Sequence, residues 1–149
     1  MPVTAVPQFE RFFRATSSLD VDKSDVKRCR DFIYQNIYDL LVIAAATAKT
    51  NGRDIIEPAD LPITKGLQES IHKFRRLDQD IELLPVLDEL TDYPQLELGL
   101  SGETIEQLPM IAGGLTLALS CTFPIIDPDV KNPQTEQWER AFRLFDLLL

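Results

Sequence analysis

The chain has 149 residues, of which 44% are hydrophobic and 26% charged, and its formal net charge is -9. These values predict one soluble globular domain over residues 1–149, because two half-sized domains would each be thinly stabilised. Cys29 and Cys121 lie in helical apolar patterns, which predicts small buried thiols rather than a disulfide framework. With no signal-peptide pattern at the N-terminus, this cysteine usage favours a reducing cytoplasm.

The charge is divided unevenly between the two halves of the chain. Residues 1–77 carry 12 Lys and Arg against 10 Asp and Glu, whereas residues 78–149 carry 3 against 14. Such asymmetry bears on solubility and on the choice of partner rather than on fold. The acidic second half is therefore a candidate surface for recognising another protein.

The first half predicts a short, a long and a medium helix. An aromatic pattern at Phe9, Phe12 and Phe13 indicates a helix that ends near residues 17–18, and residues 20–24 have helix-start character. A long amphipathic helix over 24–51 follows, because apolar residues recur there at spacings of three and four: Val26, Cys29, Ile33, Ile37, Leu40, Ala44 and Ala48. Gly52 suits its C-terminal cap. After it we expect a brief extended segment at 55–56 and a medium helix bearing Ile63, Leu67, Ile71, Phe74 and Leu77.

The second half repeats this plan with little sequence identity. Leucines at 83–90 predict a short helix that residues 92–94 stop, and residues 96–100 form a linker. A long helix over 103–126 carries the stripe Ile105, Leu108, Ala112, Leu115, Leu119, Phe123 and Ile126. Residues 127–129 break it, and Asn132–Pro133 starts the last helix. The repeats span about 7–77 and 81–149.

The stretch from Pro109 to Ile126 has no charged residue and reaches the lower length limit of a membrane span. Its small polar residues, its prolines and the lack of basic flanks favour a helix buried nearly all round, with no membrane. Gly113 and Gly114 lie mid-helix, where missing side chains let another backbone approach. We expect the two long helices to cross there, near Ile37 and Leu41.

The segment that closes the first long helix, from Ala48 to Leu61, resembles the closing motif of the histone fold. The short, long and medium helices, present twice, resemble that fold over the whole chain. In histones the residues matching Arg53 and Asp60 form a clamp between the second loop and the last helix. The resemblance therefore implies a structural role for this pair.

Because both copies lie in one chain, the sequence is similar to a bacterial family of uncharacterised proteins with a doubled histone fold. Segments that carry this likeness are 19–23, 38–41, 51–54, 61–69 and 131–136. The resemblance implies an all-α fold in which two tandem histone motifs pair intramolecularly, and a monomer, since the dimer interface is internal. It implies no activity.

Histones hold DNA through basic first and second loops, and this geometry can be applied to the chain. One predicted loop pair joins acids at 20, 22, 127 and 129 to two lysines, and the other joins acids at 54, 57, 97 and 103 to Lys49 and Arg53. Both pairs would repel phosphate. Asp54–Ile55 also replaces the Lys-Thr of DNA-binding relatives.

A weak, sequence-independent nucleic-acid contact is the alternative function. Five basic residues of the first half are its candidate contacts: Arg11, Arg14, Lys27, Arg28 and Arg30. The competing interpretation is a solvated helix face that pairs with Asp25, Asp31 and Asp39.

The sequence predicts no enzyme, cofactor or metal site. His72 is the only histidine and has no marked partner for general-base chemistry, and neither cysteine has a nearby base. Acids at 20, 22, 25 and 31 faintly match a calcium loop, but the glycine at its sixth position and the final glutamate are missing. The leading prediction is a non-enzymatic structural or interaction module with an unidentified protein partner.

Overall fold

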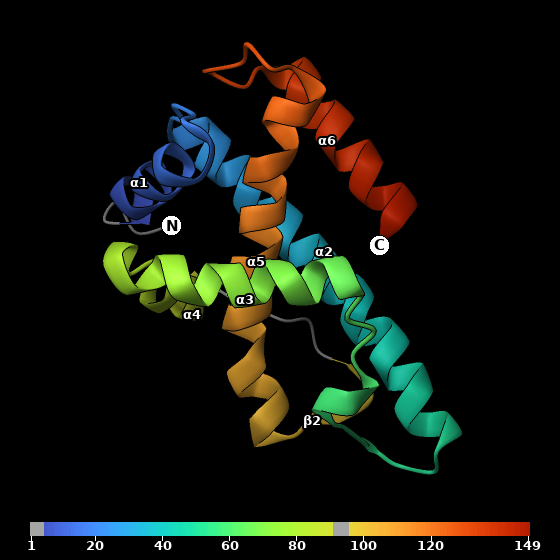
Figure 1. The fold of residues 1–149 in the computed structure, drawn as a ribbon. Helices are drawn as coiled ribbons and strands as arrows, with labels where there is room; N and C mark the ends of the chain where they lie inside the picture. The colour runs from blue at the N-terminus through green and yellow to red at the C-terminus, as the bar shows by residue number, and fades with distance from the viewer. Residues whose placement is uncertain (1–4, 91–95) are drawn as a thin grey trace.

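The computed structural model describes residues 5–90 and 96–149, and within them the fold is all-α apart from one pair of two-residue strands (Figure 1). In chain order the elements are α1 (Ala5–Ser17), α2 (Lys23–Thr50), β1 (Ile55–Ile56), the 3-10 turn η1 (Pro58–Asp60), α3 (Lys65–Ile81), α4 (Leu84–Leu90), β2 (Gly99–Leu100), α5 (Gly102–Ile126) and α6 (Thr135–Leu148).

The apolar helix α5 lies at the centre of the molecule. It packs most extensively against α3 and also contacts α1, α2, α4 and α6. Figure 1 shows α3 crossing one face of α5 and α2 crossing the opposite face, with α1 and α4 to one side and α6 to the other. The core is therefore built around α5.

Local signals explain where the helices begin and end. Asp22 caps α2 through a reciprocal capping box with Asp25, and the Ser101 hydroxyl caps α5 by accepting from the Thr104 amide at 3.1 Å. Gly52 follows α2 with a φ of 72°, a conformation that glycine adopts without strain. The predicted helices over 24–51 and 103–126 are confirmed to within a residue at each end.

The predicted start of the last helix differs from the structure. Helix α6 begins at Thr135 with Gln134 as its N-cap, so the predicted start at Asn132–Pro133 is two residues early. The predicted stop at 92–94 lies outside the described residues.

On α2 the predicted stripe is buried, and on α5 many residues outside the predicted stripe are buried as well. Every member of the α2 stripe is buried, whereas on α5 Ile105 is 41% exposed although the neighbouring Thr104 is fully buried. From Leu108 to Leu117 nearly the whole circumference of α5 is covered. Helix α5 is long and apolar enough to cross a membrane by length and composition, but 61% of its apolar window is buried inside the fold. Its apolar character thus serves the core of this structure.

The glycine pair packs against α3 on the side where its Cβ atoms would lie, and α2 crosses α5 on the opposite face (Figure 1). A Cβ added to Gly113 would overlap the Phe74 ring, and one added to Gly114 would lie 3.0 Å and 3.1 Å from the Ile71 backbone N and Cα. The sequence did not predict that α3 covers this pair, because periodicity shows that a face is free of side chains and not which helix covers it. The crossing of the two long helices near Ile37 and Leu41 stays a prediction.

Candidate functional site

The loops gather at two ends of the molecule. At one end, which we call the strand end, β1 and β2 pair in parallel, with Ile55 opposite Gly99 and Ile56 opposite Leu100. At the other, the cap end, the Asp20 amide donates to the Lys131 carbonyl at 2.7 Å, which joins the α1–α2 loop to the α5–α6 loop. Both predicted loop pairs are therefore in contact. Residues 99–100, predicted as linker, form a strand because Ile55–Ile56 lies beside them.

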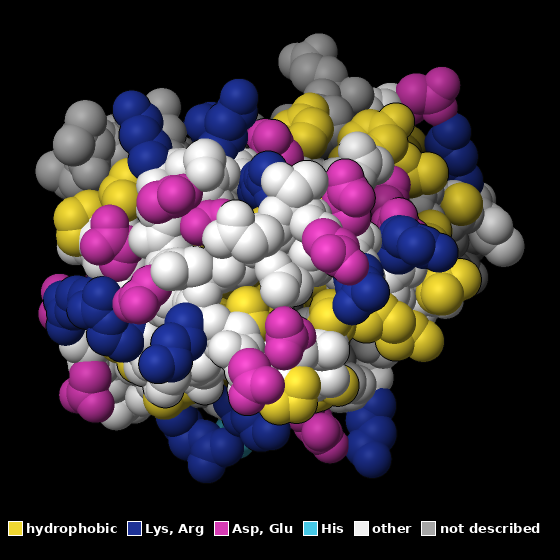
Figure 2. Space-filling model, turned by 90° about the horizontal axis from the view of Figure 1, so that it is seen from above, with side chains coloured by type: hydrophobic (Ala, Val, Ile, Leu, Met, Phe, Trp, Pro, Cys, Tyr) yellow, Lys and Arg dark blue, Asp and Glu magenta, His cyan; other side chains and the backbone are white. Residues whose placement is uncertain are grey.

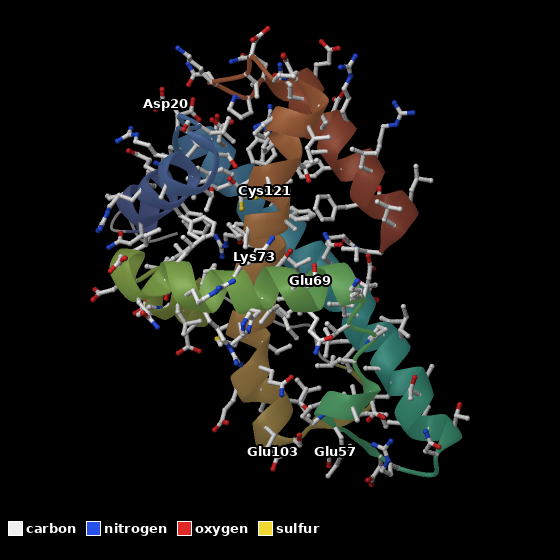
Figure 3. The ribbon with its side chains drawn as sticks, in the orientation of Figure 1. Asp20, Glu57, Glu69, Lys73, Glu103 and Cys121 are labelled. Atoms are coloured by element: carbon white, nitrogen blue, oxygen red, sulfur yellow. The ribbon has the colours of Figure 1, made fainter. Side chains whose placement is uncertain are left out.

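At the strand end the basic side chains of the loop pair form ion pairs with carboxylates of the same chain. Lys49 forms an ion pair with Glu97, and Arg53 forms one with Asp60. Exposed acids at 54 and 103 remain nearby, and Figure 3 shows Glu57 and Glu103 together at this end. A phosphate group would meet no unpaired Lys or Arg among the described residues of this loop pair.

The cap end is similar in charge. Arg14 pairs with Asp20 at 3.3 Å, and Asp127 accepts from the Gln137 amide and from the backbone N–H of Asp129. Figure 2 looks onto this end and shows Asp and Glu side chains scattered among Lys and Arg, without a continuous basic surface. The geometry of the loops is suited to a shared surface, but their charge is not suited to DNA.

The predicted clamp residues form a bidentate ion pair. Arg53 donates from Nη1 and Nη2 to the two carboxylate oxygens of Asp60, both at 2.6 Å, and the Glu57 amide donates to Asp60 at 2.8 Å. These donors lower the pKa of Asp60 to about 2, with the Arg53 hydrogen bonds as the main cause. The Asp60 carboxylate is buried while Arg53 stays partly exposed, so the pair joins the second loop to η1.

A second carboxylate site was missed by the sequence prediction. Asp25, expected on a solvated helix face, is 8% exposed and accepts a hydrogen bond from the Trp138 indole Nε1 at 2.8 Å. Its other oxygen accepts from the Asp22 amide at 3.0 Å. Burial raises the pKa of Asp25, partly offset by these hydrogen bonds. No sequence signal links residues 25 and 138, because the contact spans α2 and α6.

The five basic residues proposed as nucleic-acid contacts are partly engaged inside the fold. Arg11 donates to the Asp80 carbonyl, Arg14 pairs with Asp20, and Arg28 donates to the Thr135 hydroxyl at 2.8 Å. Lys27 and Arg30 take part in no ion pair within the described residues. The proposed basic face is thus reduced by internal hydrogen bonds.

The remaining reactive residues are separated from one another. Cys29 is buried in the core, and this burial raises the pKa of its thiol to about 12, so the nucleophilic thiolate is suppressed. Cys121 is exposed on α5, which corrects its predicted burial (Figure 3). His72 is exposed on α3. The carboxylates of the faint calcium-loop pattern serve other roles, since Asp22 and Asp25 cap α2.

Comparisons with known proteins agree with this architecture. A solved protein of Thermus thermophilus is 51% identical to the chain, with a TM-score of 0.85 and 97% of each chain covered. A solved protein of Aquifex aeolicus has the same TM-score at 24% identity, covering 97% of this chain and 95% of its own, and it supports the fold alone.

The sequence comparisons give one relative and one family. An uncharacterised protein of Aquifex aeolicus strain VF5 is 28% identical over 110 residues, which is 74% of this chain and 64% of that protein. The chain therefore spans less than two thirds of the length of that relative. The family model described as a domain of unknown function (DUF1931) matches residues 9–146. The chain belongs to this DUF1931 family of bacterial proteins.

Proposed function

We propose that the chain is a histone-like pseudodimer contained in one polypeptide. Each half contributes a short, a long and a medium helix: α1, α2 and α3, then α4, α5 and α6. The β1–β2 pair and the Asp20–Lys131 bond join the second loop of each half to the first loop of the other. Two histone motifs paired head to tail would create both junctions. Because this pairing surface is internal, we expect a monomer, which sedimentation equilibrium can test.

In function, the chain is a non-enzymatic interaction module that does not bind DNA through its loops. The observation that carries this proposal is the charge of the two loop pairs, where Lys49, Arg53 and Arg14 each pair with a carboxylate of the same chain. Affinity for a duplex depends on neutralising phosphates with free cations and releasing counterions. Lys23 and Lys131 at the cap end form no ion pair within the described residues, but the acids at 20, 22, 127 and 129 outnumber them two to one. The loop surface therefore lacks this driving force.

A gel-shift titration with linear duplex DNA at low and moderate salt tests the proposal. We expect no retardation at moderate salt. Retardation that persists there, and that Lys27→Gln with Arg30→Gln removes, would instead support the alternative nucleic-acid role on the first half.

Charge reversal tests the loop geometry directly. A variant with Asp20→Lys, Asp54→Lys, Glu97→Lys and Asp129→Lys places cations at both ends, and we expect it to gain salt-sensitive duplex binding. The matched control reverses four exposed acids on α4 and α6: Asp88→Lys, Glu89→Lys, Glu139→Lys and Asp146→Lys. It has the same net charge but no new loop cations. Equal gains in both variants would show that overall charge matters and the loop positions do not.

The acidic second half is the proposed surface for a protein partner. A pull-down from native lysate treated with nuclease should retain a defined basic protein, in a salt-sensitive manner. Asp127→Asn with Asp129→Asn should weaken this retention, whereas Asp31→Asn with Asp39→Asn, the same charge change in the first half, should not. Recovery of nucleic acid before nuclease treatment would contradict this role.

A further inference from the structure

A cleft lies where α3 diverges from the N-terminal half of α5, and it is separate from both loop ends. Gly114 lies against Ile71 of α3, and toward Gln107 the space between the two helices is bordered by η1. We call this space the α3 cleft. Its volume is about 410 Å³, within the range of about 300–1,000 Å³ that small-molecule sites occupy.

The inner part of the α3 cleft is apolar and belongs to three elements or their flanks. Leu61 and Ile111 are 6% and 2% exposed, so the floor is part of the packed core and is already formed. The other apolar residues that line the cleft are the half-buried Pro58, Ile63, Ile71 and Met110 and, at the edge, the exposed Ala59. A rigid apolar floor can cover the hydrocarbon part of a ligand without a large rearrangement.

The rim of the cleft is polar and carries Arg75, His72 and Gln68 from α3 and Gln107 from α5. None of these four side chains forms a hydrogen bond or ion pair with another part of the described chain. Their donors can therefore bind a ligand without first breaking an internal bond. Arg75 offers a planar set of N–H donors that matches a carboxylate or phosphate group.

The surroundings of Arg75 favour an anion, although the whole chain is acidic. Between residues 65 and 76 there are four cations, Lys65, Lys73, Arg75 and Arg76, and a single acid, Glu69. Glu69 lies 3.9 Å from Lys65, which reduces its repulsion of a ligand. Figure 3 shows Lys73 and Glu69 on α3, with Glu57 and Glu103 apart from them at the strand end. Arg75 is the one of these cations that lines the cleft, and the positive balance of this stretch of α3 is opposite in sign to the net charge of the molecule.

We propose that the α3 cleft binds a small amphipathic organic anion, whose carboxylate or phosphate is held by Arg75 and the rim amides while its apolar part contacts the floor. The floor contains no aromatic side chain on which a nucleobase would stack, which argues against a single-stranded nucleic acid. This site does not depend on the proposed function, and either can fail without the other.

The test is an NMR titration of the intact chain with octanoate and octyl phosphate, which distinguish the two anionic groups. Inorganic phosphate and 1-octanol are the controls, because each has only half of the required chemistry. We expect saturable shifts of backbone amides in 58–63, 68–75 and 107–111 with at least one amphipathic anion, and weaker binding of both controls.

Two variants test separately the contact of Arg75 with the anionic group and the contact of the floor with the apolar part of the ligand. Arg75→Gln should weaken binding of the anion roughly ten-fold, as expected for a lost hydrogen bond to a charged group, whereas Arg143→Gln on α6 should not. Ala59→Phe, on η1 at the edge of the floor, should obstruct the floor and weaken binding of both octanoate and 1-octanol. Retained amide dispersion will verify folding of each variant.

Several results would overturn the proposal. The first is 1-octanol binding as tightly as the anions. The second is a set of shifts confined to the apolar groove between α3, α5 and α6, which is lined by Leu67, Thr122, Ile125 and Leu148. The third is equal behaviour of Arg75→Gln and Arg143→Gln, and the last is the absence of any saturable shift.

Discussion

At the strand end, a short backbone ladder and the Lys49–Glu97 ion pair join the halves of the chain, beside the Arg53–Asp60 pair within the first half. At the cap end a buried indole meets a buried carboxylate. The strand end combines β1–β2 pairing with a hydrogen bond from the Thr104 hydroxyl to the Ile56 carbonyl at 2.8 Å. The cap end combines one backbone bond, from Asp20 to Lys131, with the Trp138–Asp25 contact.

This comparison indicates which interactions stabilise each end of the molecule. Arg53 keeps access to water, so the charge of the strand-end clamp remains partly solvated. Trp138 is 1% exposed and packs edge-on against Phe123, so the cap end depends on apolar burial and on one hydrogen bond that water cannot replace. Substitution should therefore cost more at the cap end, and acid should act more on the strand end.

The largest effect is expected from Trp138→Ala at the cap end. Removal of this buried ring should lower the free energy of unfolding by about 3–5 kcal/mol, measured by urea denaturation. Trp138→Phe keeps most of the ring but leaves Asp25 without its indole donor, which should cost about 1–3 kcal/mol. If Trp138→Phe unfolds at the same urea concentration as the wild type, the hydrogen bond contributes nothing to the cap end.

An intermediate loss in the free energy of unfolding is expected at the contact of α5 with α3, between the two ends. Gly114→Val would press a branched side chain against the Ile71 backbone, which cannot move as a rotamer can. We expect a loss of about 1–3 kcal/mol in urea denaturation. Gly66→Val is the matched control, since a Cβ at Gly66 meets no atom within 4 Å. Valine is a better helix former than glycine, so helix propensity predicts no loss in either variant. Equal losses in the two variants would mean that the close crossing does not explain the result.

The pH dependence should have opposite signs at the two ends. The pKa of Asp60 is lowered from 3.8 to about 2, so its contribution is present above 3.8 and is lost as pH falls toward 2. Asp60→Asn and the wild type should therefore converge in thermal midpoint over this range. The pKa of Asp25 is raised above 3.8, so its contribution grows as pH falls through that raised pKa.

The matched variant for the cap end is Asp25→Asn. The advantage of the wild type over Asp25→Asn should increase on acidification, the reverse of the trend for Asp60→Asn. Parallel trends in both variants, measured by thermal melts between neutral and acid pH, would contradict the assigned pKa directions.

The smallest effect is expected from Glu97→Gln, which removes the exposed ion pair with Lys49. The two side chains are 81% and 53% exposed, so solvent screens their attraction. We expect no measurable change in thermal midpoint at moderate salt, and the β1–β2 pairing should persist in amide exchange. A clear loss of stability would show that the strand end depends on surface charge more than on its backbone bonds.

The order and extent of the helices could be predicted from the sequence by itself, because capping residues, apolar periodicity and Gly52 act over a few neighbouring positions. The pairing of Arg53 with Asp60 was implied by the resemblance to the closing motif of the histone fold, in which the matching Arg and Asp lie seven positions apart. The tertiary structure alone decided which helix covers Gly113 and Gly114, that Gly99–Leu100 becomes a strand, that Asp25 is buried beneath Trp138, and that Arg75 borders an apolar cleft. Each of these depends on residues far apart in the chain, and periodicity identifies a face to be covered without identifying the segment that covers it.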